Sequence, residues 1–348
     1  MSVRRRFDID DLVVQARQGQ PRAVARLISL VEDSAPELRD VATALAPYAG
    51  RAQIVGVTGA PGVGKSTSVN MLVTALRAAG KKVGVLAVDP SSPFSGGALL
   101  GDRVRMQDHA LDDGVFIRSM ATRGHLGGIA SATPQTLRVL DAAGCDVVLV
   151  ETVGVGQSEI EVVSLADTTV VLLAPGMGDG IQAAKAGILE VADVFVVNKA
   201  DRDGADQTVR DLRHMISLGR REREGPSWRP PIVATVATKA GGIDDLVVAI
   251  EEHRNWMVAH GELDARRQRR AEAEIEAIAL AALRAKFGDV RRGSLLPGLA
   301  KRVVVGELDP YRAADELIAE LAAKRYNVGE YGAGLDQPRG RGAVVHHQ

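Results

Sequence analysis

One octapeptide constrains the fold of this chain more than any other feature. Gly59-Ala60-Pro61-Gly62-Val63-Gly64-Lys65-Ser66 follows the pattern G-x-x-x-x-G-K-[ST] of a phosphate-binding loop. The apolar run Ile54–Val57 before it predicts a strand, and Ser66–Ala79 after it predicts a helix. Glycines let backbone N–H groups turn toward phosphate oxygens, and the helix N-terminus adds positive partial charge. We therefore expect Lys65 to reach the β- and γ-phosphates and Ser66 to ligate Mg²⁺.

Further short apolar runs, each bounded by Gly, Pro, Asp or Asn, predict the rest of a sheet. They are Ile54–Val57, Val83–Val88, Val115–Ile117, Val147–Val150, Val170–Leu173, Val194–Val197 and Ile232–Val236. Continuous β-branched runs are typical of strands that are covered on both faces, as in parallel sheets. The fold class that we predict is α/β, a P-loop NTPase with a mostly parallel central sheet in residues 51–240.

Helical segments flank this predicted domain. Residues 1–50 read as an N-terminal helical extension, with one helix starting at Pro21 and another over Leu38–Leu45. Residues 241–328 read as a C-terminal helical arm, and the glycine-rich residues 329–348 as a mobile tail. The helices predicted in the arm are Ile243–Met257, Glu262–Phe287 and Asp309–Leu321. An apolar stripe on the second of these requires a cover, which we expect to be a second copy of the chain: Ile275, Ile278, Ala279, Ala282 and Leu283.

A second motif follows the predicted strand Val194–Val197. Asn198-Lys199-Ala200-Asp201 matches N-K-x-D, the guanine-specificity motif of GTPases. The Asp201 carboxylate would accept hydrogen bonds from guanine N1–H and the 2-amino group, and adenine offers neither, so a mismatch would leave a polar group unpaired. Lys199 would lie over the base. The loop Val236, Ala237 and Thr238 comes at the position where GTPases place backbone N–H groups against guanine O6.

Acidic residues at other predicted strand ends are candidates for the metal site. Glu151 ends the run that starts at Asp146, and Gly154 lies three residues further on, where its N–H can sense the γ-phosphate. Glu151 would support Mg²⁺ directly or through water. Asp89 and Asp102 could hold metal-bound waters or the attacking water, and either could equally be a turn or capping residue.

The composition of the chain limits the partners and the cellular location that we expect. The chain has 348 residues with 43 Lys+Arg and 44 Asp+Glu, so its net charge is -1. This near-neutral charge and an aromatic content of only 3% argue against a nucleic-acid partner. No apolar run reaches the roughly 18 residues that span a bilayer, and no secretory signal is evident, so we expect no membrane partner and a cytoplasmic location. We expect the basic run Arg266–Arg270 to be a solvated helix face, and His253 and His260 to be structural or surface residues.

Five segments together carry a family resemblance: GAPGVGKST, VDPSSPFSGGALLGDR, ATRGHLGG, ETVGVGQSE and NKAD. Over nearly its whole length the chain resembles the methylmalonyl-CoA-mutase-associated GTPases, the MeaB/MMAA family, also called ArgK-type or LAO/AO transport ATPases. The resemblance implies a homodimeric GTPase that binds GTP or GDP with Mg²⁺ and dimerises through the C-terminal arm. It also implies an adenosylcobalamin-dependent methylmalonyl-CoA mutase as partner, whose cofactor loading the GTPase gates and which it protects from inactivation.

The same resemblance assigns roles to residues. Phosphate and Mg²⁺ binding fall to Lys65, Ser66 and Thr67, and the surroundings of the metal and the γ-phosphate to Asp89, Asp102 and Glu151. Guanine is read by Asn198, Lys199 and Asp201, with Val236–Thr238 completing the base pocket. Lys185, in a further switch loop Gly176–Lys185, is implied to reach the nucleotide and joins Lys65, Asp89 and Glu151 as a catalytic candidate. No glutamine directly follows Gly154, so slow unassisted turnover is expected.

Other functions stay open at this point. A metal-insertion GTPase of a related subgroup would need a Cys/His cluster, whereas the chain has one cysteine, Cys145, and scattered histidines. A kinase linked to amino-acid transport would need a catalytic loop of the kinase type, which the sequence lacks. A structural protein that binds the nucleotide only to stabilise its fold, without hydrolysing it, is also compatible with these motifs.

Overall fold

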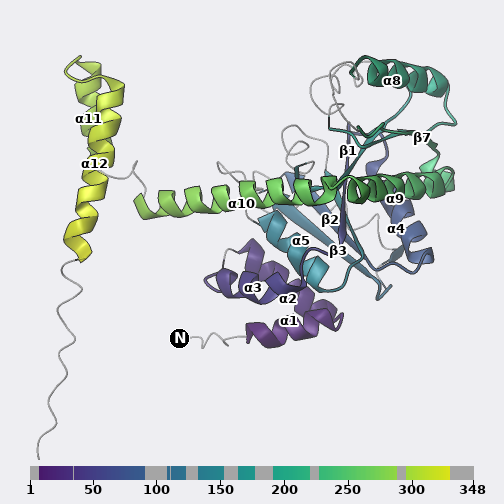
Figure 1. Ribbon diagram of the computed structural model, residues 1–348, viewed down its shortest axis with the longest axis horizontal. Helices are drawn as coiled ribbons and strands as arrows, with labels where there is room; N and C mark the ends of the chain where they lie inside the picture. Colours follow the sequence, from purple (N-terminus) through teal and green to yellow (C-terminus); the bar gives the residue numbers. More distant parts are fainter. Residues whose placement is uncertain are drawn as a thin grey trace, which may run out of the picture. The chain divides into compact units, whose positions relative to one another are not determined.

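The computed structural model of the protein describes residues 8–33, 35–90, 108–109, 111–122, 132–152, 164–176, 191–219, 227–287 and 295–329 (Figure 1). The chain divides into two compact units, Met1–Ala277 and Ile278–Gln348. Within the described ranges, no helix is both long enough and apolar enough to cross a membrane.

The first unit is built on a seven-stranded sheet in the order β3-β2-β4-β1-β5-β6-β7, and all of its strand pairs are parallel. The strands are β1 (Gln53–Gly59), β2 (Val83–Pro90), β3 (Val115–Thr122), β4 (Val147–Thr152), β5 (Thr168–Leu173), β6 (Val194–Asn198) and β7 (Ile232–Thr235). Each predicted apolar run is therefore a strand, and the predicted P-loop NTPase class is confirmed. Because all strands run the same way, their carboxyl ends form one edge of the sheet.

Alternate residues of the central strands pack on opposite faces, which explains the continuous apolar runs. On one face, Val55 and Leu149 contact α4 (Lys65–Ala78) and α9 (Ile243–Ala259). On the other face, Val148 and Val150 belong to a cluster formed with α5 and the N-terminal helices. These helices are α1 (Ile9–Arg17), α2 (Pro21–Glu32), α3 (Leu38–Leu45), the short η1 (Ala46–Tyr48) and α5 (Ala132–Ala142).

The face of the sheet that carries Val148 and Val150 extends over β5 and β6. Val171 and Phe195 pack there against Leu212 of α8 (Ala205–Gly219). Both faces of the sheet are thus covered, and loops at the strand ends are the surfaces left to contact a ligand.

The basic run 266–270 lies on α10 (Glu262–Phe287), and the prediction that it forms a solvated face is wrong for three of its arginines. Arg266 donates two hydrogen bonds of 2.8 Å to the carboxylate of Asp193, and Arg267 donates two, of 3.2 and 2.8 Å, to that of Asp167. Arg270 bonds the Leu165 carbonyl. Both carboxylates are buried at the starts of β5 and β6, and a buried carboxylate requires a partner, so the arginines pair with them.

In the second unit, α11 (Leu295–Val304) packs against α12 (Pro310–Gly329). Asp309 caps α12 by accepting hydrogen bonds from the N–H groups of Tyr311 and Arg312. Arg302 donates to Glu316 at 2.6 Å and joins the two helices.

Candidate nucleotide-binding site

The phosphate-binding loop connects β1 to α4 at the carboxyl edge of the sheet, as predicted. Gly59 has φ +146°, and a Cβ there would collide with the carbonyl oxygen of Leu172. Gly64 has φ +98°, and a Cβ there would collide with the amide nitrogen of Asn198. Any larger residue at these positions would displace a neighbouring strand or the Asn198 side chain. The motif glycines are therefore required by close approach as well as by backbone angle.

Lys65 is the first residue of α4, and its side chain turns back over the loop. Its Nζ donates to the carbonyl of Gly59 at 2.6 Å and to that of Ala60 at 3.2 Å. The residue is only 7% exposed. A buried ammonium held by carbonyls above a helix N-terminus is placed to contact an anion in the loop, which fits the terminal phosphates of a nucleotide.

Ser66 and Glu151 meet across the sheet edge, although 85 positions separate them in the sequence. The Ser66 hydroxyl donates to Glu151 Oε1 at 2.6 Å, and Glu151, in β4, is 2% exposed. A hydroxyl and a carboxylate oxygen beside a phosphate site form a hard-oxygen donor pair of the kind that Mg²⁺ binds together with substrate phosphates. The residues present therefore fit a Mg²⁺-nucleotide.

Asn198, the last residue of β6, joins three loops. Its Nδ2 donates to the Val63 carbonyl in the phosphate loop at 2.8 Å. Its Oδ1 accepts from the Thr235 hydroxyl and from the Ala237 N–H, each at 3.1 Å. The residue is 3% exposed. The asparagine of N-K-x-D thus holds the phosphate loop and the base loop together, because all three of its hydrogen bonds go to protein atoms.

The two other polar residues of N-K-x-D stand nearer to solvent. Lys199 has φ +57° and donates from Nζ to the Gly62 carbonyl at 2.6 Å, so its side chain spans from β6 to the phosphate loop. The Asp201 side chain is 44% exposed and lies 3.2 Å from Lys239 Nζ. Lys239 ends the turn η4 (Ala237–Lys239), which also contains Ala237 and Thr238 and follows Val236.

Lys239 is a site residue that none of the sequence motifs identifies by role. The signal available was its positive charge at the end of the predicted base loop, opposite the acid of N-K-x-D. A half-exposed carboxylate with one cation beside it can still accept hydrogen bonds from a base edge.

The helix that carries the phosphate loop also holds the segment that follows residues 91–107. Asn70 donates to the Asp108 carboxylate at 3.3 Å, and Arg77 donates to both oxygens of Asp112, at 2.9 and 2.8 Å. The Arg77 hydrogen bonds, aided by the Gly114 N–H, lower the pKa of the Asp112 carboxyl. These contacts join residues 35 to 38 positions apart, and no local sequence pattern indicates them.

Four predicted site residues are only partly described or not described. Asp89 lies near the carboxyl end of β2, in register with Ala121, and its side chain lies outside the described residues. Asp102, Gly154 and Lys185 also lie outside the described residues. The structure therefore unites Lys65, Ser66, Glu151 and the base loops and leaves these four as predictions.

A phosphate loop, a buried acid at the end of a neighbouring strand and an N-K-x-D loop at the same sheet edge define a P-loop NTPase of the GTPase class. The family described as "Methylmalonyl Co-A mutase-associated GTPase MeaB" matches residues 24–290. The chain belongs to this family.

Known proteins resemble the chain over most of its length. A Pyrococcus abyssi protein named as a GTPase is 47% identical over 323 residues, which are 92% of this chain and 99% of that protein. The mitochondrial methylmalonic aciduria type A homolog of Mus musculus is 34% identical over 91% of this chain and 80% of its own length. A crystal structure described as an LAO/AO transport system kinase has a TM-score of 0.69 and 30% identity, covering 92% of this chain and 100% of that one.

Proposed function

We propose that this member of the GTPase family binds GTP with Mg²⁺ and hydrolyses it slowly when alone. The observation that carries the proposal is the contact of 2.6 Å between Ser66 and buried Glu151 beside the phosphate loop. Lys65 would contact the β- and γ-phosphates, and Asp201 would accept from the guanine edge. A bound Mg²⁺ would offset the charge that develops on the phosphates. Glu151 would support the Mg²⁺ directly or through a water.

The client that we propose is an adenosylcobalamin-dependent methylmalonyl-CoA mutase. Support comes from the description of the family and from the name of the mouse relative, which is that of methylmalonic aciduria. On this proposal the GTPase gates loading of the cofactor into the mutase and protects the mutase, with the GTP and GDP states differing in what they permit. Partner proteins often complete the catalytic site of a slow GTPase.

A hydrolysis assay with the mutase of the same organism tests this proposal. We expect the mutase to accelerate phosphate release by about tenfold or more, given the range of partner-assisted GTPases. Lys65→Ala protein, handled in parallel, reports contaminating activity, and an unrelated protein at equal concentration controls for crowding. No acceleration, together with no complex on gel filtration in either nucleotide state, would exclude the mutase as client and leave the GTPase assignment standing.

We also propose that two copies associate through α10. Three residues of its apolar stripe are exposed, Ile275 at 67%, Ile278 at 47% and Leu283 at 48%, and covering them would remove apolar surface from water. Light scattering should report a dimer for the native chain and a monomer for Ile278→Glu with Leu283→Glu. Val248→Glu, which changes an equally exposed apolar residue on α9, is the matched control and should remain dimeric.

A further inference from the structure

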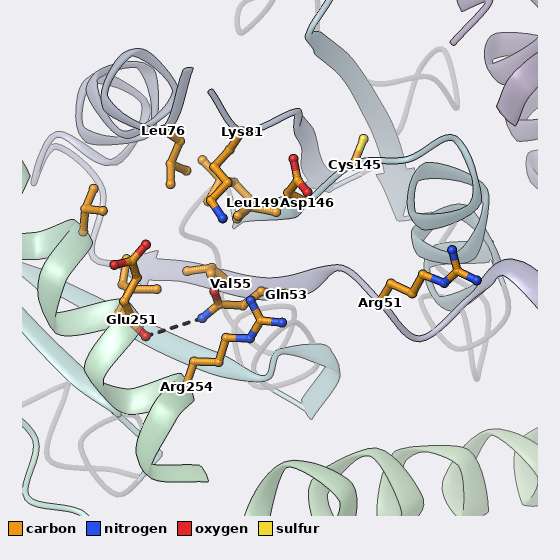
Figure 2. A pocket seen from close by; sticks show the side chains of 13 residues that line it. Arg51, Gln53, Val55, Leu76, Lys81, Cys145, Asp146, Leu149, Glu251 and Arg254 are labelled. Carbon is orange, nitrogen blue, oxygen red and sulfur yellow. Dashed lines mark hydrogen bonds between the residues drawn. The ribbon is translucent and has the colours of Figure 1, made fainter. Parts of the chain in front are cut away.

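A second concave site lies at the opposite end of the sheet from the nucleotide loops. A cavity of about 130 Å³ opens where β1 and β4 begin, between α4 and α9 (Figure 2). Its apolar wall is formed by Val55, Leu76, Leu149, Val247 and Ile250. None of the described residues assigned above to nucleotide or metal binding lines it.

The charged side chains around this cavity are unevenly buried. Lys81 and Arg254 are half-buried, whereas the two acids, Asp146 and Glu251, are exposed. Neither Lys81 nor Arg254 forms an ion pair with any residue in the described ranges. Partly desolvated cations without a partner gain more from a bound anion than exposed carboxylates gain from a bound cation.

A buried amide also lines the cavity. In Figure 2, the Arg254 guanidinium is drawn beside Gln53, Lys81 is drawn on another side of the cavity, and the Arg51 guanidinium points away. Gln53 is 3% exposed, and its Nε2 donates to the Ile250 carbonyl at 3.4 Å and to the Thr168 hydroxyl at 3.5 Å. Both distances exceed the usual N–H···O length of about 2.9–3.0 Å, so this buried donor is weakly satisfied.

We propose that this cavity binds a small organic carboxylate, with the carboxylate near Lys81, Arg254 and the Gln53 amide and a short apolar chain against Val55 and Ile250. The cavity is close in size to the engineered cavity of about 150 Å³ that holds benzene, so a chain of about four to five carbons fits. Burial raises the pKa of the lining Cys145 thiol to about 12, so this thiol is uncharged at neutral pH and does not repel a carboxylate.

The proposal is independent of GTP hydrolysis and of the mutase. Calorimetry on the full chain in excess GDP, at neutral pH, uses four probes: valerate, its neutral analogue valeramide, the cation pentylamine and inorganic phosphate. We expect saturable binding of valerate, and binding weaker by about tenfold or more for the three others, because each lacks either the negative charge or the apolar chain. Valeramide or pentylamine binding as tightly as valerate, or no saturation by valerate, would overturn the proposal.

Variants locate the binding. Val247→Phe fills the cavity and should abolish valerate binding, whereas Val248→Phe, at the next position and 51% exposed outside the cavity, should not. Lys81→Met and Arg254→Met should each weaken valerate by about fivefold or more, and Lys301→Met, an exposed lysine of α11, should not.

The Lys65→Ala variant tests whether valerate binds at the cavity or at the phosphate loop, since that loop can itself attract an anion. If Lys65→Ala leaves the valerate affinity unchanged, the cavity is supported as the binding site. Valerate affinity lost with Lys65→Ala and kept with Val247→Phe assigns the anion to the phosphate loop and refutes the proposal. Because this comparison does not require GDP to bind, a failure of the GTPase assignment would be seen separately.

Discussion

Replacement of Asn198 by alanine would disconnect the phosphate loop from the base loop. The Asn198 side chain donates to the Val63 carbonyl at 2.8 Å and accepts from Thr235 and from the Ala237 N–H, each at 3.1 Å. Alanine makes none of these bonds. Because the position is 3% exposed, water cannot readily replace the lost partners.

The magnitude follows from the number of bonds. A buried hydrogen bond contributes about 1 kcal/mol net, so three such bonds give a loss of about 3 kcal/mol in the free energy of unfolding. The Val63 carbonyl and the Ala237 N–H lie in the two loops that would contact phosphate and base. We therefore expect GDP affinity to fall by about tenfold or more, since about 1.4 kcal/mol corresponds to a factor of ten.

Urea unfolding without nucleotide, followed by titration with fluorescent GDP, measures both effects. Asn255→Ala, an exposed asparagine on α9, is the matched control and should change neither quantity. Asn198→Asp refines the test, because it keeps both accepted bonds and places a carboxylate oxygen against the Val63 carbonyl; it should impair GDP binding at least as strongly as alanine. Native stability and native GDP affinity for Asn198→Ala would refute the supporting role.

Three further predictions concern specificity, hydrolysis and pH. Asp201→Asn should weaken GTP and favour xanthosine triphosphate, because an amide can pair with a 2-oxo group; competition binding measures this, and ATP bound as tightly as GTP by the native chain would contradict the base-pocket assignment. Glu151→Gln should spare nucleotide binding and lower phosphate release, and unchanged turnover would remove Glu151 from the catalytic set. Burial of His253 lowers its pKa to about 4, against attraction by Asp193, whereas the unfolded chain protonates it at its ordinary value of 6.5. The unfolded state therefore binds more protons between these values, and stability should fall by up to about 3 kcal/mol as pH drops from about 6.5 to 4; urea unfolding of His253→Gln should lose this part of the slope, and an unaltered slope would disprove it.

The local features of the nucleotide site could be predicted from the sequence. The octapeptide Gly59–Ser66 has a fixed pattern because the positive φ angles of Gly59, Gly62 and Gly64 favour glycine, and that backbone constraint is local. The seven strands could be predicted because burial on both faces makes each a continuous apolar run. The helices α9 and α10 could be predicted from their apolar spacing, within two residues at their ends.

Long-range contacts were decided only by the tertiary structure. The support that Asn198 gives to Val63 joins residues 135 positions apart, and N-K-x-D indicates base recognition without indicating that bond. In the sequence, Arg266 is part of a basic run that predicts a solvent-exposed helix face. In the structure it pairs with Asp193, 73 positions away, because that carboxylate is buried at the start of β6 beside α10. The cavity between α4 and α9 likewise requires the packing of two helices against β1 and β4. A sequence pattern reports the period of burial along one segment, whereas partner choice depends on which segments the fold brings together, and no local pattern carries that information.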